Sequence, residues 1–140
     1  MNYLDTSIVA AFYLPEAMSR KVQNFYALRD TAAISALTEV EFYSVVSRRV
    51  RMKDLTRNDA LKVVSLFRAH VDGNFYRFVA VAQREYALAR DWLATFQTPL
   101  RTLDALHLAA AFSYDCMLVT ADSDLGRAAR HFGVKHKLIC

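Results

Sequence analysis

A chain of 140 residues, 54% of them apolar, is long enough to bury a hydrophobic core, and we expect one domain spanning residues 1–140. Only 3 glycines and 2 prolines are present, which excludes a disordered or low-complexity protein. The net charge of +4 at pH 7 is mild and permits an anionic partner without requiring one.

Short apolar segments alternate with segments of helical spacing along the first half of the chain. Residues 2–5 predict a buried first strand, after which Thr6 and Ser7 turn the chain into a helix over about residues 8–14. Pro15 suits the first position of a second helix, which we expect to reach about residue 28. A weak strand over residues 31–35 and two helices, over about residues 37–52 and from Thr56 to the Asp72–Asn74 turn, follow.

The second half of the chain has the same alternation. We expect strands over residues 78–82, 116–120 and 137–139, and helices over about residues 83–96, from Thr102, and over residues 124–132. Strands that alternate with helices predict a parallel or mostly parallel sheet with helices on both faces. The expected fold class is therefore a three-layer α/β/α domain.

The sequence also bears on the cellular compartment. The first residues lack the basic start and apolar run of a signal peptide, and no apolar run approaches the roughly 18–20 uncharged residues of a membrane span. Cys116 and Cys140 form neither a CxxC motif nor a disulfide framework. We therefore expect a cytoplasmic protein with free thiols and no membrane segment.

Acidic residues follow the expected strands and begin an expected helix. Asp5 ends the first strand, Asp122 follows the strand over residues 116–120, and Asp104 lies two residues inside the helix for which Thr102 is the expected N-cap. In open α/β sheets, sites form at the carboxyl ends of the strands, where helices also begin. Three acids that are distant in the sequence are therefore expected at one edge of the sheet.

The helix over residues 37–52 offers a fourth acid. At 100° per residue, Glu41 falls on a stripe that we expect to face the core, whereas Glu39 faces water. The stripe consists of Leu37, Val40, Ser44 and Val45. Glu41 is therefore the expected partner of the three aspartates.

Each of the four acids also has a purely structural explanation. Asp5 suits a turn after a strand, and Thr38 with Glu41 fits a capping box. Asp104 suits the positive end of a helix dipole, and Asp122 suits an N-cap. The individual signals are weak, and the shared edge of the sheet is what favours a site.

Clustered carboxylates need a counter-charge, because two of them about 4 Å apart repel by roughly 4 kcal/mol at an effective dielectric near 20. No lysine or histidine is obviously placed to supply it, since His107 lies one turn deeper in its helix, where we expect a buried, hydrogen-bonded side chain. A hard divalent cation is the natural counter-charge, and the absence of Cys/His pairs argues against zinc. Mg²⁺ or Mn²⁺ suits phosphate-ester chemistry, in which the metal activates water and stabilises charge on the phosphate.

Four segments carry a resemblance to a known family. They read Tyr-Leu-Asp-Thr-Ser from residue 3, Ile-Ser-Ala-Leu-Thr-Glu-Val-Glu from residue 34, Arg-Thr-Leu-Asp-Ala-Leu-His-Leu-Ala from residue 101, and Leu-Val-Thr-Ala-Asp-Ser-Asp-Leu from residue 118. In these segments the chain resembles the PIN-domain ribonucleases, specifically the VapC-type toxins of type II toxin–antitoxin pairs. The resemblance implies a PIN-like fold, a Mg²⁺-dependent endoribonuclease, a homodimer and an antitoxin partner whose tail enters the acidic groove.

The resemblance also implies roles for individual residues. The four acids of the family fall on Asp5, Glu41, Asp104 and Asp122, as catalytic residues and metal ligands. Thr6 and Ser7 fall where hydroxyl ligands or water-positioning groups are expected. Asp124 falls at a position that varies in the family, so its part in the site stays open.

An RNA substrate requires positive charge near the acidic pocket. Arg101 is close in sequence to Asp104 and is placed to bind a phosphate beside the scissile one. Arg48 and Arg49 belong to a basic cluster, with Arg51, Lys53 and Arg57. The same cluster fits a solvated helix end, where cations favour the dipole, and both interpretations remain open.

We therefore interpret the chain as a metal-dependent endoribonuclease toxin. The alternative is a catalytically silent PIN-like module that binds RNA or protein without cutting. Phosphatases and phospho-receiver domains also place an Asp after the first strand. A haloacid-dehalogenase-type phosphatase needs a second Asp where Ser7 stands, however, and a receiver needs an acidic pair that residues 2–7 lack.

Overall fold

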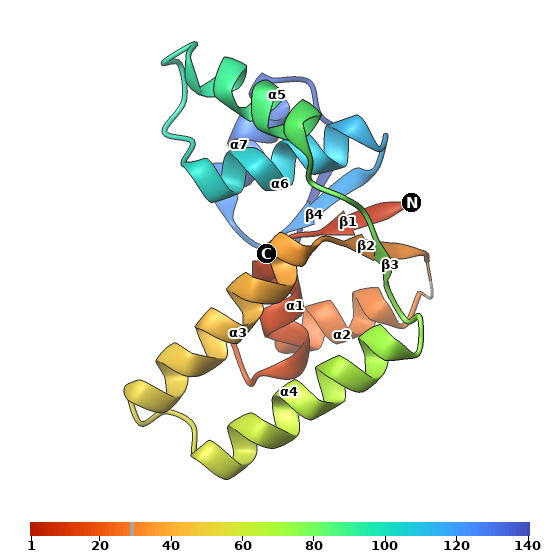
Figure 1. The fold of residues 1–140 in the computed structure, drawn as a ribbon, viewed down its shortest axis with the longest axis vertical. Helices are drawn as coiled ribbons and strands as arrows, with labels where there is room; N and C mark the ends of the chain where they lie inside the picture. The colour runs from red at the N-terminus through yellow and green to blue at the C-terminus, as the bar shows by residue number, and fades with distance from the viewer. Residues whose placement is uncertain (29) are drawn as a thin grey trace.

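The structure, a computed structural model, describes residues 1–28 and 30–140 (Figure 1). Within these residues five strands form one sheet in the order β3-β2-β1-β4-β5, and all neighbouring strands are parallel. The strands are β1 (Asn2–Leu4), β2 (Ala32–Ile34), β3 (Arg77–Phe78), β4 (Met117–Thr120) and β5 (His136–Leu138). The parallel sheet confirms the expected α/β fold class.

Helices cover both faces of this sheet (Figure 1). On one side lie α1 (Thr6–Tyr13), α2 (Ser19–Tyr26), α3 (Ala36–Arg51) and α4 (Arg57–Asp72). On the other lie α5 (Gln83–Leu93), α6 (Thr102–Ser113) and α7 (Ser123–His131). None of the helices in the described part of the chain is long and apolar enough to cross a membrane.

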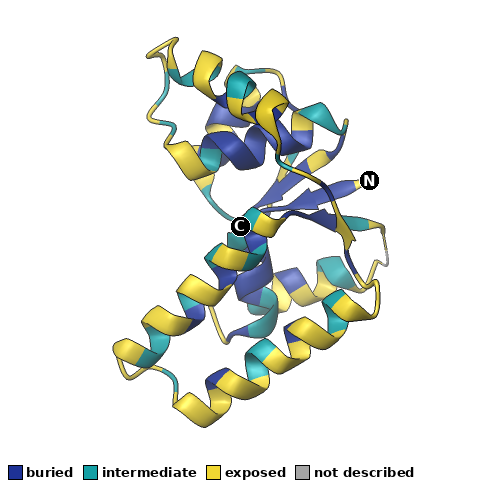
Figure 2. Ribbon diagram, viewed as in Figure 1, coloured by how far each residue is buried: buried dark blue, intermediate teal, exposed yellow. Residues whose placement is uncertain are grey.

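The core lies in two layers, one on each side of the sheet (Figure 2). Ile8, Phe42 and Phe67 belong to the layer under α1, α3 and α4. The other layer is built around α6, which is buried continuously from Ala105 to Ala111. A helix made almost wholly of Leu and Ala can be buried on all sides. Cys116 is buried and Cys140 is exposed, and both are free thiols, as expected.

The central strand β1 brings the two ends of the sequence together. Leu4 pairs with Val119 of β4, and the Asp5 N–H donates to the Val119 carbonyl at 3.2 Å. Because both strands run in the same direction, their carboxyl ends lie side by side. The loops after β1 and β4 therefore meet at one edge of the sheet.

Two expected elements differ from the structure. The second helix begins at Ser19, not at Pro15, because the Ser19 hydroxyl accepts from the Glu16 N–H at 2.8 Å and donates to the Leu14 carbonyl at 2.9 Å, which stabilises a loop there. The strand expected over residues 78–82 is the two-residue edge strand β3, whose residues are exposed. Val79 adds one further bond, to the Ile34 carbonyl at 2.9 Å, before the chain leaves the sheet.

Two expected helix starts also differ. The N-cap of α3 is Ser35, and the Thr38 hydroxyl accepts from the Ser35 N–H at 3.3 Å, so the capping box expected at Thr38 and Glu41 does not form. The N-cap of α6 is Arg101, which makes Thr102 the first helical residue and not the cap. Glu41 is therefore free of a capping role.

Candidate active site

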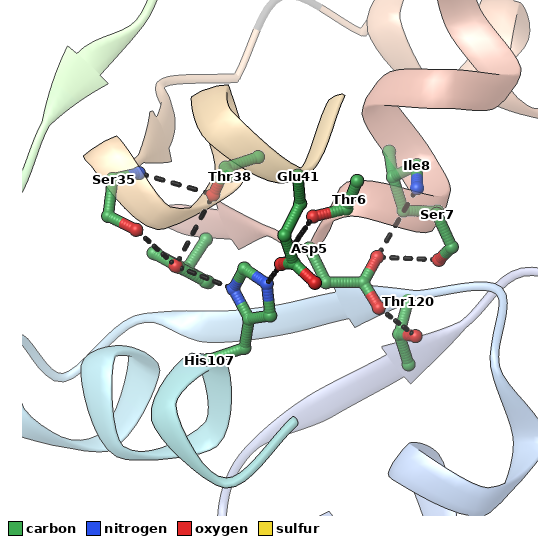
Figure 3. Close-up of polar contacts among 10 residues, drawn as sticks. Asp5, Thr6, Ser7, Ile8, Ser35, Thr38, Glu41, His107 and Thr120 are labelled. Atoms are coloured by element: carbon green, nitrogen blue, oxygen red, sulfur yellow. Dashed lines mark hydrogen bonds and ion pairs between the residues drawn. The ribbon is translucent and has the colours of Figure 1, made fainter. Parts of the chain in front are cut away.

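Asp5 is the most tightly held acid of the site. It caps α1, and its Oδ1 accepts from the Ser7 hydroxyl at 2.6 Å and from the Ile8 N–H at 3.2 Å (Figure 3). Its Oδ2 accepts from the Thr120 hydroxyl. The residue is only 4% exposed. Burial raises the pKa of Asp5, and the hydrogen bonds from Ser7 and Thr120 oppose that rise.

The two hydroxyls that bind Asp5 also bind the loop after β4. The Ser7 hydroxyl accepts from the Ala121 N–H, and the Thr120 hydroxyl accepts from the Asp122 N–H, both at 3.0 Å. Asp122 in turn caps α7, because its Oδ1 accepts from the Asp124 N–H at 2.8 Å. Asp122 is thus the N-cap that its structural explanation predicted, whereas Asp5 is the N-cap of α1 and not a turn residue. The two caps fix the positions of the two acids.

Glu41 reaches the same edge from α3. Its Oε1 accepts from the Thr6 hydroxyl at 2.8 Å and from Nε2 of His107. The buried stripe of this helix is Thr38, Phe42 and Val46. The stripe expected from the sequence is wrong, since Val40 is 66% exposed. Glu41 lies beside the buried face, where its side chain extends toward α1 and α6.

His107 is the residue that sequence reasoning underrated. Its ring is 2% exposed and lies between Glu41 and the hydroxyl of Tyr3, 2.8 Å from Nδ1. The expectation of a buried, hydrogen-bonded histidine is correct, but the expectation that no histidine reaches the acids is wrong. The available signal was its spacing, since Asp104 and His107 are three residues apart and share a face of α6.

The charges of the other three acids affect the pKa of the half-buried Asp104. Burial raises the pKa of its carboxyl group, and the charges of Asp122, Asp5 and Glu41 raise it further, against the opposing effect of His107. Burial also acts to raise the pKa of Glu41, but the hydrogen bonds from His107 and Thr6 outweigh it and leave that pKa lowered. The four acids therefore act on one another, as their positions in the fold require.

A groove of about 500 Å³ opens beside the acids. Its lining consists of Glu41, Leu93, Leu100, Arg101, Thr102, Leu103 and Asp104. The groove thus combines two acids, one arginine and an apolar wall. Arg101, which the sequence analysis placed near Asp104, therefore lines the same groove as Asp104.

The remaining sequence candidates divide into two groups. Arg48 is exposed and lies seven residues after Glu41, on the same helix face and about 10.5 Å further along the axis. Arg49 forms an ion pair with Glu16 at 2.9 Å. Asp124 is exposed and pairs with Arg127, so the structure directs its carboxylate to the surface.

The donor atoms suit a hard cation, because all four acids offer carboxylate oxygens, the ligands that Mg²⁺ and Mn²⁺ prefer. Within residues 1–28 and 30–140, however, no three His, Cys, Asp or Glu side chains are gathered closely enough to hold an ion. Binding of a cation therefore has to draw the carboxylates together. Repulsion from the other carboxylates adds to the effect of burial in raising the pKa of Asp104, and a cation would relieve that repulsion.

The chain was compared with known proteins. Residues 3–131 match the PIN domain family. No curated protein sequence matches the chain. Several solved structures share its fold at low sequence identity. VapC20 of Mycobacterium tuberculosis, described as a sarcin-ricin loop cleaving toxin, has a TM-score of 0.72 and 18% identity, over 91% of this chain and 95% of that chain.

Two further solved structures share the fold over nearly the whole chain. FitAcB of Neisseria gonorrhoeae has a TM-score of 0.67 and 20% identity, over 97% of this chain and 96% of that chain. DNA-bound VapBC of Salmonella typhimurium has a TM-score of 0.65 and 21% identity, over the whole of both chains. Because the family match spans nearly the whole chain and the fold agrees, this chain belongs to the PIN-domain family.

Proposed function

We propose that the chain is a metal-dependent endoribonuclease and the toxin of a toxin–antitoxin pair. The observation that carries this proposal is the meeting of Asp5, Glu41, Asp104 and Asp122 at one edge of the sheet, where their charges act on Asp104. Membership of the PIN-domain family supports a nuclease. The likeness to structures described as a toxin and as a toxin–antitoxin complex supports the narrower role.

Mg²⁺ or Mn²⁺ would be held by Asp5 and Asp104, with Glu41 and Asp122 completing the pocket. When bound, the cation supplies activation of water and stabilisation of negative charge on the phosphate. The chain itself fixes the carboxylate of Asp5, which accepts hydrogen bonds through both of its oxygens. Thr6 and Ser7 act by orienting Glu41 and Asp5. Orientation of this kind removes reorganisation from the reaction.

RNA phosphates would bind at the basic side of the groove. Arg101 lines the groove together with Asp104, and the exposed Arg48 extends the basic surface along α3. Arg49 contributes only when a phosphate displaces Glu16 from its ion pair. Guanidinium groups bind phosphate oxygens through two parallel hydrogen bonds, which fixes the orientation of the backbone.

We further propose a cytoplasmic homodimer that a cognate antitoxin silences. A similar solved structure described as a toxin–antitoxin complex supports such a partner, and three other similar structures are bound to DNA. An antitoxin tail that enters the groove would place its own basic group among the acids. Such a tail would compete directly with the RNA.

The experiment compares cleavage of labelled RNA by the wild type, Asp104→Asn and Asp91→Asn, with Mg²⁺, Mn²⁺ or EDTA. Asp91 is a suitable control because its carboxylate is exposed and pairs with Arg90. We expect metal-dependent cutting by the wild type and by Asp91→Asn, and a loss of at least about 100-fold in Asp104→Asn, the loss typical for a group that stabilises developing charge. Equal cutting by all three proteins would refute the site. Metal and RNA binding without cutting would favour the catalytically silent module.

A further inference from the structure

A buried row of polar side chains ends on Glu41. The hydroxyl of Tyr3 lies 2.9 Å from the Ser35 hydroxyl and 2.8 Å from Nδ1 of His107. The opposite ring nitrogen of His107 contacts Glu41 (Figure 3). Tyr3 and Ser35 are 0% exposed. The row therefore connects β1 and the start of α3 to the acid site through α6.

The direction of the bond to Glu41 is fixed by chemistry. An ionised carboxylate can only accept hydrogen bonds, so Nε2 of His107 carries the proton that faces it. The ring cannot turn over without placing carbon atoms against both Tyr3 and Glu41. Hydrogen bonds at both ring nitrogens therefore hold His107 in one orientation. Histidines that bind metals are oriented in a comparable way, by a hydrogen bond at the ring nitrogen that does not face the metal.

The hydrogen bonds to Glu41 leave one of its oxygens free. In the described part of the chain, the bonds from Thr6 and His107 both go to Oε1, and none reaches Oε2. One oxygen thus fixes the side chain, and the other is available to a ligand. This is how an anchored carboxylate ligand is held.

Packing alone does not require this arrangement. His107 lies in a helix whose other buried residues are Ala and Leu, and a buried imidazole is costly unless its nitrogens are paired. An apolar side chain would fill the same space without that requirement. The polar row therefore has its effect at its exposed end, which is Glu41.

We propose that His107, held by Tyr3, is a positioning residue that directs the free oxygen of Glu41 toward the cation. The identity of the ligand as a divalent cation rests on the proposed function. His107 itself touches neither the cation nor RNA. Its effect is measured as metal affinity, because a Glu41 held by Thr6 alone is more mobile and would have to be ordered each time the cation binds.

The chain offers a matched control for this test. Tyr13 and His70 form the same kind of pair, with the Tyr13 hydroxyl 2.6 Å from Nδ1 of His70, and Tyr76 as a further partner at 2.8 Å. The pair lies in the core layer under α1 and α4, and neither residue contacts any of the four acids by a hydrogen bond in the described residues. Tyr13→Phe thus removes an equivalent bond elsewhere.

The experiment measures Mn²⁺ affinity of the metal-free protein by calorimetry for the wild type, His107→Leu, His107→Gln, Tyr3→Phe and Tyr13→Phe. The glutamine amide can donate to Glu41 from nearly the position of Nε2, whereas leucine cannot. We expect Mn²⁺ affinity to fall about 10- to 100-fold in His107→Leu, the loss typical of removing an outer partner of a metal ligand. His107→Gln should recover most of that loss, Tyr3→Phe should show a smaller loss, and Tyr13→Phe should bind like the wild type. In RNA cleavage, the Mn²⁺ concentration that gives half-maximal activity should rise in His107→Leu.

Wild-type Mn²⁺ affinity in a folded His107→Leu protein would overturn the proposal, as would a glutamine variant no better than the leucine variant. Where His107→Leu does not fold, Tyr3→Phe decides, and an unchanged affinity there refutes the role. A wild type that binds Mn²⁺ without cutting RNA contradicts the proposed function and leaves the affinity comparison intact. A cutting wild type with normal metal binding by His107→Leu contradicts only the positioning role.

Discussion

Replacement of Thr120 by valine tests how far the fold depends on the hydroxyl that joins the two acidic loops. Thr120 is 0% exposed, and its hydroxyl donates to Asp5 and accepts from the Asp122 N–H. Valine keeps the shape and removes both bonds. A bond to a charged group contributes about 1.5–3 kcal/mol and a neutral one about 0.5–1.5 kcal/mol, so the two together contribute about 2–4 kcal/mol. For a domain of this size, that corresponds to a fall in Tm of about 8–16 °C.

The assay is thermal unfolding of the metal-free protein, followed by circular dichroism in EDTA. Thr120→Ser is the control, because it keeps the hydroxyl and loses one methyl group, which costs about 1 kcal/mol. Equal destabilisation by the two substitutions would refute the hydrogen-bonding argument.

The pH dependence of the Thr120→Val deficit gives a second test of the same reasoning. Burial raises the pKa of Asp5 and the Thr120 hydroxyl lowers it, so the variant should have a still higher pKa at Asp5. A raised carboxyl pKa favours the fold below the unfolded value, near 3.9, and that contribution is lost as the pH rises through the folded value. The deficit of the variant should therefore be smaller near pH 4 than at pH 7. A deficit that is no larger at pH 7 than at pH 4 would contradict this.

Three further predictions concern the acids and the buried tyrosines. Burial and the charge of Asp122 raise the pKa of Asp104, so the ionised carboxylate lowers the stability of the metal-free protein at neutral pH. Asp104→Asn should therefore raise the Tm, whereas the control Asp91→Asn should leave it unchanged. Mg²⁺ at about 100 times its Kd should stabilise the wild type by about 2.7 kcal/mol in a thermal-shift assay, and an equal shift in Asp104→Asn would exclude Asp104 as a ligand. Burial raises the pKa of Tyr3 to about 12, so the shift contributes about 3 kcal/mol to the free energy of unfolding below pH 10, and this contribution is lost as the pH rises toward 12. Denaturant titration should show this fall in the wild type and a smaller fall in Tyr3→Phe. A free energy of unfolding that does not change over this pH range would contradict the prediction.

Periodicity and capping residues were sufficient to predict the elements whose causes are local. The helix opened by Thr56 is α4, whose cap hydroxyl accepts from the Asp59 N–H at 3.1 Å, and the Leu/Ala run after Asp104 is the buried α6. The strand predicted over residues 78–82 is longer than the observed β3, and the reason lies outside the segment itself. That segment lies at the edge of the sheet, where the chain turns away to begin α5.

The candidate site was predictable in its acids and not in its supporting residues. Asp5 and Asp122 follow strands, so the general rule for parallel sheets was enough to bring them together. Glu41 was chosen for a stripe that the structure does not have, because the packing of α3 against α1 and α4 decides which face is buried. The contact of His107 with Tyr3 joins residues 104 positions apart, and no local pattern contains such information.

The hydrogen bond from Thr120 to Asp5 spans 115 positions of the sequence, and this separation has a consequence during synthesis. A growing polypeptide makes β1 first and its neighbour β2 soon after, but β4, the strand on the other side of β1, is made more than 100 residues later. Contacts of such long range form slowly, because the intervening loop must be closed before they contribute. Asp5 and Asp122 therefore meet only after β4 has been translated, and a chain that stops before β4 lacks the pocket.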